Sequence, residues 1–381
     1  MASAAQKRIK SISYAKYGYI FILPFFLVYF FFQLWPLVNT FVLSFKGNDT
    51  TVEEFVGFDN YKTILFDTDV DMDVVKGTSP KLENMSAEEK KEARKAEQAK
   101  VGQKAQHDTF VKSFGNTLIL WIGNFIPQII LSLSLAVWFT DAKLKIPGKG
   151  FFKVVMYMPN IITAASVAVL FLSLCSESKY GALNQILHSV GIVDDITSTN
   201  STDFVKFISG KWEPRIVVMF IQTWMWFGNT MIMLMSGIMG INPSLFEAAS
   251  IDGASSGQVF RKITLPLLSP IMVYTLVTSM IGGLQMFDIP YLFHKGTNDL
   301  NPEIRTVAVY IYERFHTSGT ISYSYGYSGA ASVLLFIVTL ILGSITFYMN
   351  RDVDAIAKKK QRKKLAKQAK LQNKQFGGLS I

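Results

Sequence analysis

Cysteine is nearly absent from this chain, and the motifs of ATP-binding and zinc-dependent proteins are missing. The 381 residues include one cysteine, Cys175, and four histidines. A single cysteine excludes a disulfide within the chain and any metal site built from several thiolates. The sequence holds no Gly-x-x-x-x-Gly-Lys-Ser/Thr phosphate loop and no His-Glu-x-x-His zinc motif. We therefore predict that the chain is not an enzyme, has no catalytic residues, metal or cofactor, and does not itself bind ATP.

Charged residues are also scarce, and six long segments have none. Only 17% of the residues are charged and 50% are hydrophobic, whereas about a quarter of a soluble domain is charged. Each charge-free segment exceeds the roughly 20 residues that a helix needs to cross a bilayer core. Backbone groups in lipid must be satisfied internally, so these segments should be helices. They lie between Lys16 and Lys46, Lys112 and Asp141, Lys153 and Glu177, Arg215 and Glu247, Lys262 and Asp288, and Arg314 and Arg351.

These segments predict an all-α membrane protein with six transmembrane helices. A transmembrane domain over residues 17–350 would follow a short N-terminus, 1–16, and precede a basic tail, 351–381. An outer insertion at 66–110 interrupts the domain. The helices are expected at about 18–44, 113–139, 152–175, 215–240, 267–293 and 326–349.

Basic residues indicate the orientation of the spans. The formal net charge is +10, and lysine and arginine gather at the N-terminus, after the second span and in the tail. With six spans these three regions share one side of the membrane, which the positive-inside rule places in the cytoplasm. We interpret the tail as a solvated or lipid-binding run rather than a nucleic-acid site. The predicted location is a bacterial plasma membrane, with both termini cytoplasmic.

The middle of the outer insertion predicts a helix that is polar on all faces. Residues 86–106 are rich in Ala, Glu and Lys, and Ser86 with Glu89 forms a capping-box pattern. Such a helix projects into water or docks on a partner. Both interpretations stay open: a solvated spacer, or a contact with an external binding protein.

The loop after the fourth span predicts two short helices joined by a glycine. Asn242 followed by Pro243 is a typical helix start. Gly253 can take the left-handed conformation that ends a helix. Ser255 with Gln258 forms a second capping box. This helix-turn-helix, at the membrane surface between two spans, is an element that a soluble partner can grip.

The residues of this loop also resemble a family signature. Glu-Ala-Ala at 247–249, Asp-Gly-Ala-Ser at 252–255, then Phe260 and Ile-Thr-Leu-Pro at 263–266 resemble the signature of permease subunits of binding-protein-dependent ABC importers. This version of the signature resembles that of the carbohydrate branch of the family, the maltose-type permeases. The resemblance extends to other segments, such as 326–332 before the sixth span.

The resemblance implies partners and a division of tasks. The permease would import a sugar or oligosaccharide that an extracellular solute-binding protein delivers, together with a second permease subunit. A separate dimeric ATPase would bind ATP-Mg and dock on the cytoplasmic helix-turn-helix. The implied ATPase-coupling residues are Glu247, Ala248, Ala249, Asp252, Gly253, Ala254, Phe260, Ile263, Leu265 and Pro266.

Polar and aromatic residues within the spans are candidates for the substrate pathway, because polar groups in a membrane are expensive. Aromatic rings could stack on the apolar face of a sugar while amides and a carboxylate bond its hydroxyls. Helix-to-helix hydrogen bonds and interfacial aromatic belts remain the alternative for each candidate. The candidates are Asn116, Gln128, Trp224, Asn229, Gln285, Phe287 and Asp288.

Two other functions stay open at this point. One is an ABC importer permease for another solute, such as a glycerol phosphate or a polyamine. The other is an ion-coupled secondary transporter, which should show intramembrane carboxylates; the charge-free segments argue against it.

Overall fold

The computed structural model describes residues 4–47, 54–141, 144–178, 180–193, 204–295, 301–316, 324–349 and residue 365, with side chains from Tyr17 onward. Most of these residues are helical, and the only β pairing among them is an isolated bridge between Lys46 and Phe55. The predicted all-α class is confirmed. The basic tail, apart from residue 365, lies outside the described residues.

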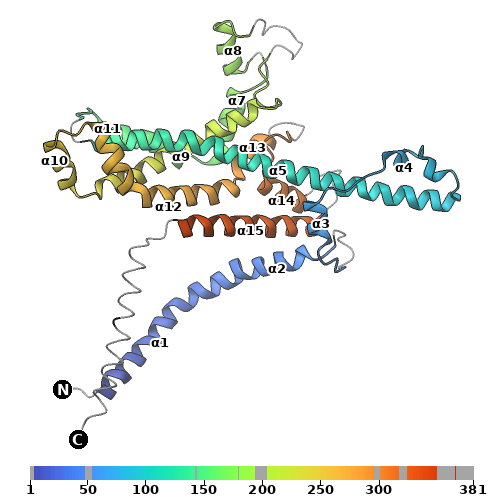
Figure 1. The fold of residues 1–381 in the computed structure, drawn as a ribbon, viewed down its shortest axis with the longest axis horizontal. Helices are drawn as coiled ribbons and strands as arrows, with labels where there is room; N and C mark the ends of the chain where they lie inside the picture. The colour runs from blue at the N-terminus through green and yellow to red at the C-terminus, as the bar shows by residue number, and fades with distance from the viewer. Residues whose placement is uncertain are drawn as a thin grey trace.

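Four long helices lie side by side and form the body of the molecule (Figure 1). They are α5 (Ala87–Thr140), α9 (Glu213–Met239), α12 (Leu265–Leu284) and α15 (Tyr325–Met349). In the described residues, five helices are long and apolar enough to cross a membrane, and a sixth span exists if one bent pair is counted. The structure therefore agrees with a multi-pass helical membrane protein.

The bent pair is the third predicted span, which is not the continuous helix expected over 152–175. Helix α6 (Lys149–Tyr157) and a 3-10 turn, η3 (Met158–Ile161), meet α7 (Ala164–Leu174) at 92°. The Thr163 side chain accepts a hydrogen bond from the Ser166 backbone N–H and so caps a new helix. Beyond the bend, α7 and α8 (Ala182–Ser189) project away from the body (Figure 1).

The fifth predicted span, 267–293, is also interrupted. Helix α12 ends at Leu284, and α13 (Asp288–Lys295) begins after a break at residues 285–287. The three residues of this break, 285–287, form a short turn that lines the cavity described below.

Two prolines in the spans follow a widened helical turn. The π-helical turn η1 (Phe30–Leu34) ends two residues before Pro36, and η4 (Phe260–Thr264) ends two residues before Pro266. Proline lacks an N–H and its ring clashes with the carbonyl four residues earlier. A π turn makes room for the ring, so the helix continues through it.

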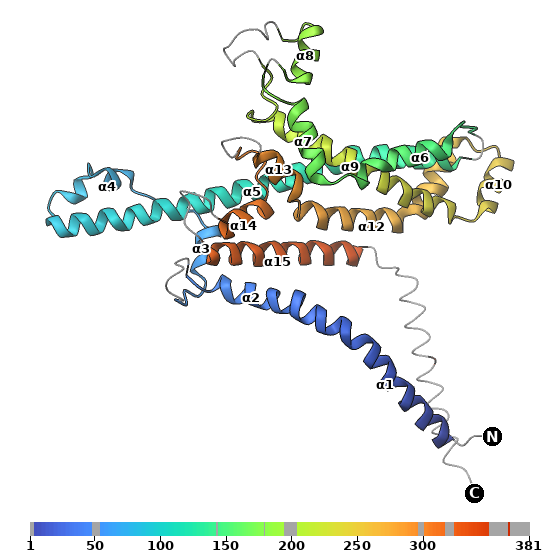
Figure 2. The same cartoon turned by 180° about the vertical axis from the view of Figure 1, so that it is seen from behind.

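The polar helix of the outer insertion is continuous with the second span. Both halves of the Ser86–Glu89 capping box are present, and α5 runs unbroken for 54 residues from there. Its N-terminal part extends beyond the body and carries α4 (Met72–Lys76) on its side (Figures 1 and 2). A side chain of α5 holds α4 in place, since Arg94 Nη2 donates to the carbonyl oxygen of Lys76 at 2.9 Å.

Small residues allow α15 to approach α2 (Trp35–Ser44) closely. A Cβ at Gly329 would lie 2.7 Å from the backbone nitrogen of Ser44, and Ala330 and Ala331 are fully buried. The Asn60 side chain, from α3 (Asp59–Leu65), donates to the carbonyl oxygen of Ser44 at 2.9 Å. The other end of this long segment, α1 (Ala4–Tyr29), diverges from the body (Figure 2).

Three groups of buried side chains make the core. One joins α5, α9 and α13, one joins α5, α9 and α12, and the third joins α3, α5, α14 (Val307–Phe315) and α15. The loop helices α10 (Pro243–Ile251) and α11 (Ser256–Val259) lie at the end of the body opposite to α4 (Figure 1).

Candidate functional site

A cavity of about 410 Å³ lies between α5, α9, α12 and the start of α13. This volume is within the range of small-molecule sites in proteins. Five of the predicted pathway residues line it: Gln128, Asn229, Gln285, Phe287 and Asp288. The structure thus brings together residues that are up to 160 positions apart in the sequence.

The walls combine aromatic rings with uncharged polar groups. The aromatic residues are Trp121, Trp226, Tyr274 and Phe287. The amides are Asn124, Gln128, Gln222, Asn229 and Gln285, and hydroxyls come from Thr230, Thr275, Thr278 and Ser279. Flat apolar rings and groups that both donate and accept hydrogen bonds suit a ligand with hydroxyl groups.

One side of the cavity is open. Tyr274 is 58% exposed and Trp226 is 47% exposed, although both line the cavity. Asn124, Gln128 and Gln222 on the inner wall are buried. The chain therefore supplies one wall of a cavity, and another molecule is needed to close it.

Hydrogen bonds between helices fix this wall. Gln128 Nε2 donates to Thr230 Oγ1 at 2.8 Å and joins α5 to α9. Trp121 Nε1 donates to Ser279 Oγ at 3.3 Å and joins α5 to α12. Within the described part of the chain, the side chains of Gln222, Asn229 and Gln285 make no such bonds, which leaves their amides available to a ligand.

Trp121 lies directly against Gly283, and this contact yields a prediction. A Cβ at Gly283 would lie 2.1 Å from Cδ1 of Trp121. Gly283→Ala is therefore expected to displace the indole into the cavity and to destabilise the protein by about 1–3 kcal/mol. Thermal unfolding of the purified protein and substrate uptake would both be measured. Gly282→Ala is the matched control, because no atom lies within 4 Å of its added Cβ; equal effects of the two variants would contradict the prediction.

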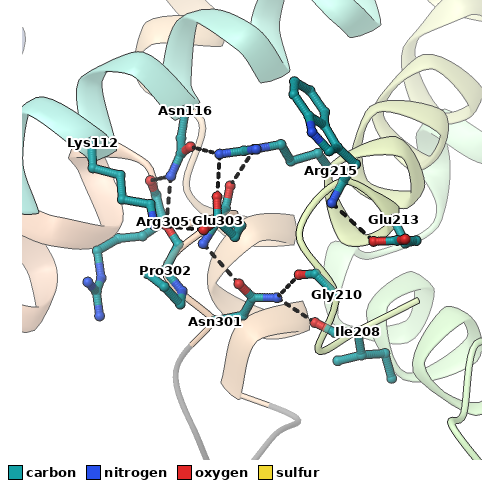
Figure 3. A network of polar contacts seen from close by, with 11 residues as sticks. Lys112, Asn116, Ile208, Gly210, Glu213, Arg215, Asn301, Pro302, Glu303 and Arg305 are labelled. Carbon is teal, nitrogen blue, oxygen red and sulfur yellow. Dashed lines mark hydrogen bonds and ion pairs between the residues drawn. The ribbon is translucent and has the colours of Figure 1, made fainter. Parts of the chain in front are cut away.

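A buried polar network holds the helices together beside the cavity (Figure 3). Arg215 Nη2 donates to Glu303 Oε2 at 2.5 Å and to Asn116 Oδ1 at 2.7 Å. Lys112 Nζ lies 2.7 Å from Glu303 Oε1. The Arg215 and Glu303 side chains are only 7% and 15% exposed. The network therefore joins the start of α9 and the middle of α5 to the segment 301–306.

Asparagine side chains complete this Glu303 network. Asn116 Nδ2 donates to the carbonyl oxygens of Pro302 and Arg305 at 2.8 and 3.1 Å. Asn301 Nδ2 donates to the carbonyl oxygens of Ile208 and Gly210 at 2.7 and 3.0 Å (Figure 3). These bonds give partners to backbone oxygens that lie outside the helices.

The charges around Glu303 set its ionisation. Burial disfavours the charged carboxylate, but the hydrogen bond from Lys112 and the charges of Lys112 and Arg215 outweigh burial. They hold the pKa of Glu303 below its ordinary value of 4.5. Glu303 is therefore an anion at neutral pH and balances the buried guanidinium of Arg215.

The network also positions one end of the cavity. Thr306 Oγ1 donates to the carbonyl oxygen of Met286 at 2.7 Å, and Met286 lines the cavity. The backbone N–H of Val307 donates to Thr117 Oγ1 at 3.0 Å. Segment 301–307 thus connects Glu303 to the interrupted turn after α12.

Two predicted pathway residues do not line the cavity. Asn116 is 1% exposed, and its amide is committed to the Glu303 network. Trp224 packs against Phe171 instead, with ring centroids 5.8 Å apart. Sequence reasoning could not separate these residues from Asn229, because helix-to-helix bonding and pathway lining use the same residue types.

Sequence reasoning also missed several residues of the site. Trp121, Tyr274 and Thr278 line the cavity. Arg215 and Glu303 belong to the Glu303 network beside it. The sequence held one signal for the Glu303 network: Lys112 and Arg215 are the charged residues directly before two of the apolar segments. Nothing in the sequence indicated that Glu303 is their shared partner.

The loop after α9 has the local structure that the sequence predicts. The Asn242 side chain accepts from the Ser244 N–H at 3.1 Å and caps α10. Gly253 has φ +71°, and both halves of the Ser255–Gln258 capping box form. Of the ten residues named from the family signature, those from Glu247 to Ala254 lie in α10 and the turn after it. Phe260 and Ile263 lie in η4, and Leu265 and Pro266 begin α12.

The surface of this loop is partly apolar. Glu247, Ala248 and Asp252 are exposed, whereas Ala249 is buried. Ile251 at the end of α10 is 86% exposed. A second cavity of about 470 Å³ lies behind α10 and is lined by Glu247, Ala254 and Phe260 among others.

Comparisons with known proteins agree with this architecture. The family described as "Binding-protein-dependent transport system inner membrane component" matches residues 128–355. The lactose transport system permease protein LacF of Rhizobium radiobacter is 27% identical over 64% of this chain and 76% of its own length. The arabinooligosaccharides transport system permease protein AraP of Bacillus subtilis is 23% identical over 92% of this chain and 94% of its own length.

Solved structures share the fold. A chain of a bacterial ABC transporter involved in import of the acidic polysaccharide alginate superimposes with a TM-score of 0.68 at 21% identity. The match covers 91% of this chain and 99% of that one. A second structure of an alginate ABC transporter, in complex with an alginate pentasaccharide-bound periplasmic protein, has a TM-score of 0.67.

Proposed function

Because this chain belongs to the family of binding-protein-dependent transport system inner membrane components, we propose that it is a permease subunit of an ABC importer that takes up a sugar or oligosaccharide. The observation that carries the proposal is the open-sided cavity of amides and aromatic rings within the spans. Relatives named for lactose and for arabinooligosaccharides support the substrate class.

A second permease subunit closes the cavity in this proposal. The exposed rim, with Trp226 and Tyr274, would otherwise place a polar pathway against lipid acyl chains. The segment Tyr17–Ser44 adds a second exposed apolar surface, since none of the residues in its most apolar stretch is buried. A closely related subunit that packs along both surfaces gives the pathway its missing wall.

An ATPase dimer docks on the helix-turn-helix at α10 and α11. The exposed residues Glu247, Ala248 and Ile251 form a surface with both apolar and acidic character. The docked ATPase would cover the side chain of Ile251, which is 86% exposed. ATP-Mg binds to that partner, and force on α10 reaches the pathway through α9 and α12, which flank the loop.

This assignment orients the chain. The helix-turn-helix faces the cytoplasm, as the positive-inside rule predicts for the loops on its side. The projecting part of α5 and the Glu303 network then face outward, where an extracellular binding protein delivers the sugar. Both termini are cytoplasmic in this arrangement.

Purification of the intact complex tests the proposal. A tagged copy, extracted gently from its native membrane, should bring down a second six-span permease and an ATPase with a phosphate loop, identified by mass spectrometry. Recovery of the chain alone, or only with itself, would refute the importer assignment. Deletion of the gene should abolish uptake of at least one saccharide, and loss of uptake of a polyamine or glycerol phosphate instead would assign another solute.

A further inference from the structure

Among the described residues that line the cavity, one carries a charge. Asp288 lies in the first turn of α13 and is exposed. None of the described residues that line the cavity is lysine or arginine. Lys112 and Arg215, the cations of the nearby Glu303 network, are already paired with Glu303. An anionic substrate would therefore meet a carboxylate on this wall, without a cation to balance it.

The remaining polar groups of the wall suit hydroxyl groups. The free amides of Gln222, Asn229 and Gln285 offer both donors and acceptors. A hydroxyl also donates and accepts, so amides and hydroxyls satisfy each other fully. A carboxylate or phosphate group only accepts, and proteins bind such groups with arginine, lysine or clustered N–H groups.

The fold does not decide the charge of the substrate. The two solved relatives belong to importers of an acidic polysaccharide and share this architecture over about nine-tenths of the chain. Substrate class depends instead on the side chains of the site that the fold carries. In this chain those side chains are aromatic, neutral or negative.

We propose that the substrate is an uncharged saccharide and that Asp288 excludes anionic ones, whether uronates or sugar phosphates. The proposal rests on the proposed function, since it concerns the charge of the imported sugar. Asp288 acts as a specificity-determining residue: its negative charge repels an anion at the open side of the cavity, and it accepts hydrogen bonds from a neutral sugar.

Uptake by intact cells separates this proposal from the function on which it rests. A deletion strain complemented with the wild-type gene would be tested with labelled lactose, arabinotriose and trehalose, and with alginate-derived trisaccharides. Restored uptake of a neutral sugar, with none of the acidic sugars, is the expected result. Restored uptake of an acidic or a cationic sugar would overturn the charge assignment but keep the sugar importer. If no saccharide is taken up, the proposed function fails and the inference falls with it.

Ligand binding to the purified complex then tests Asp288 itself. Trp121 and Trp226 line the cavity, so tryptophan fluorescence reports its occupancy. The neutral sugar from the uptake assay would be compared with its uronate form, without the binding protein. We expect the wild type to prefer the neutral sugar at least about tenfold, and Asp288→Asn to reduce this ratio severalfold.

Two controls make the binding result specific. Asp59→Asn removes the same charge from an exposed position in α3, outside the cavity, and should leave the ratio unchanged. High salt should weaken the discrimination of the wild type, because screening shortens the reach of an exposed charge. Equal wild-type affinities for the two sugars, or an Asp288→Asn ratio equal to that of wild type, would overturn the proposal.

Discussion

Glu303→Gln is expected to destabilise the purified protein by about 3 kcal/mol at neutral pH, the size of effect seen when one partner of a buried ion pair is removed. The substitution keeps the shape of the side chain but leaves the Arg215 guanidinium, 7% exposed, without its counter-charge. Lys112 would add a second positive charge at the same place. Thermal or denaturant unfolding in detergent would measure the change.

The pH dependence of this effect has a defined sign. The folded protein holds the pKa of Glu303 below the ordinary value of 4.5, so the carboxylate binds a proton more weakly in the folded state than in the unfolded state. Its stabilising contribution is complete above about pH 4.5 and is lost as the pH falls through the lower folded-state value. The difference between wild type and Glu303→Gln should therefore shrink in acid.

An exposed ion pair provides the control for Glu303. Lys62 and Asp59 lie 2.9 Å apart, and each side chain is 69% exposed. Asp59→Asn is expected to cost less than about 1 kcal/mol, because water screens such a pair. A loss of similar size in both variants would show that Glu303 has no special structural role. A double variant with Arg215→Met should recover part of the loss, because it removes the unpaired buried charge.

Gly253→Pro is expected to abolish uptake while the protein remains inserted in the membrane. Gly253 has φ +71°, and its N–H donates to the carbonyl oxygen of Ser250 at 3.3 Å. Proline fixes φ near −65° and has no N–H, so it breaks the turn between α10 and α11 at a cost of about 3 kcal/mol. The proposed docking surface for the ATPase would lose its shape, and uptake should fall by at least about tenfold.

Matched variants distinguish coupling from general damage. Gly150→Ala lies outside the docking surface, in α6, has no atom within 4 Å of the added Cβ, and should transport normally. Glu247→Lys reverses an exposed charge on α10 and should reduce uptake and ATPase co-purification together. Membrane abundance would be measured by immunoblot for every variant. Uptake at the wild-type rate by inserted Gly253→Pro protein would refute the docking role of the loop.

Much of the helical fold could be predicted from the sequence because its signals are local. A charge-free segment longer than a bilayer core has to satisfy its backbone groups internally, and a helix does so with bonds between near neighbours. The capping boxes at Ser86 and Ser255 and the left-handed Gly253 depend on residues within a few positions of each other. The predicted helix starts at these positions and the two loop helices are therefore confirmed.

Breaks within the spans were less predictable. Two helices expected to be continuous are interrupted, at Thr163 and at 285–287. Both breaks lie in apolar segments without charged residues. Tertiary packing decides there, since the turn at 285–287 is held by Thr306 from a distant segment.

What the sequence by itself determined is the number of apolar segments, their helical state, the helix-turn-helix and its family signature. What only the tertiary structure decided is which polar side chains face a shared cavity. Asn116 and Asn229 are both asparagines within apolar segments. Asn116 accepts a hydrogen bond from Arg215 in the Glu303 network, whereas Asn229 lines the cavity. The physical reason is that a helix needs only its own hydrogen bonds, whereas a cavity wall and a buried ion pair need partners from helices far apart in the chain.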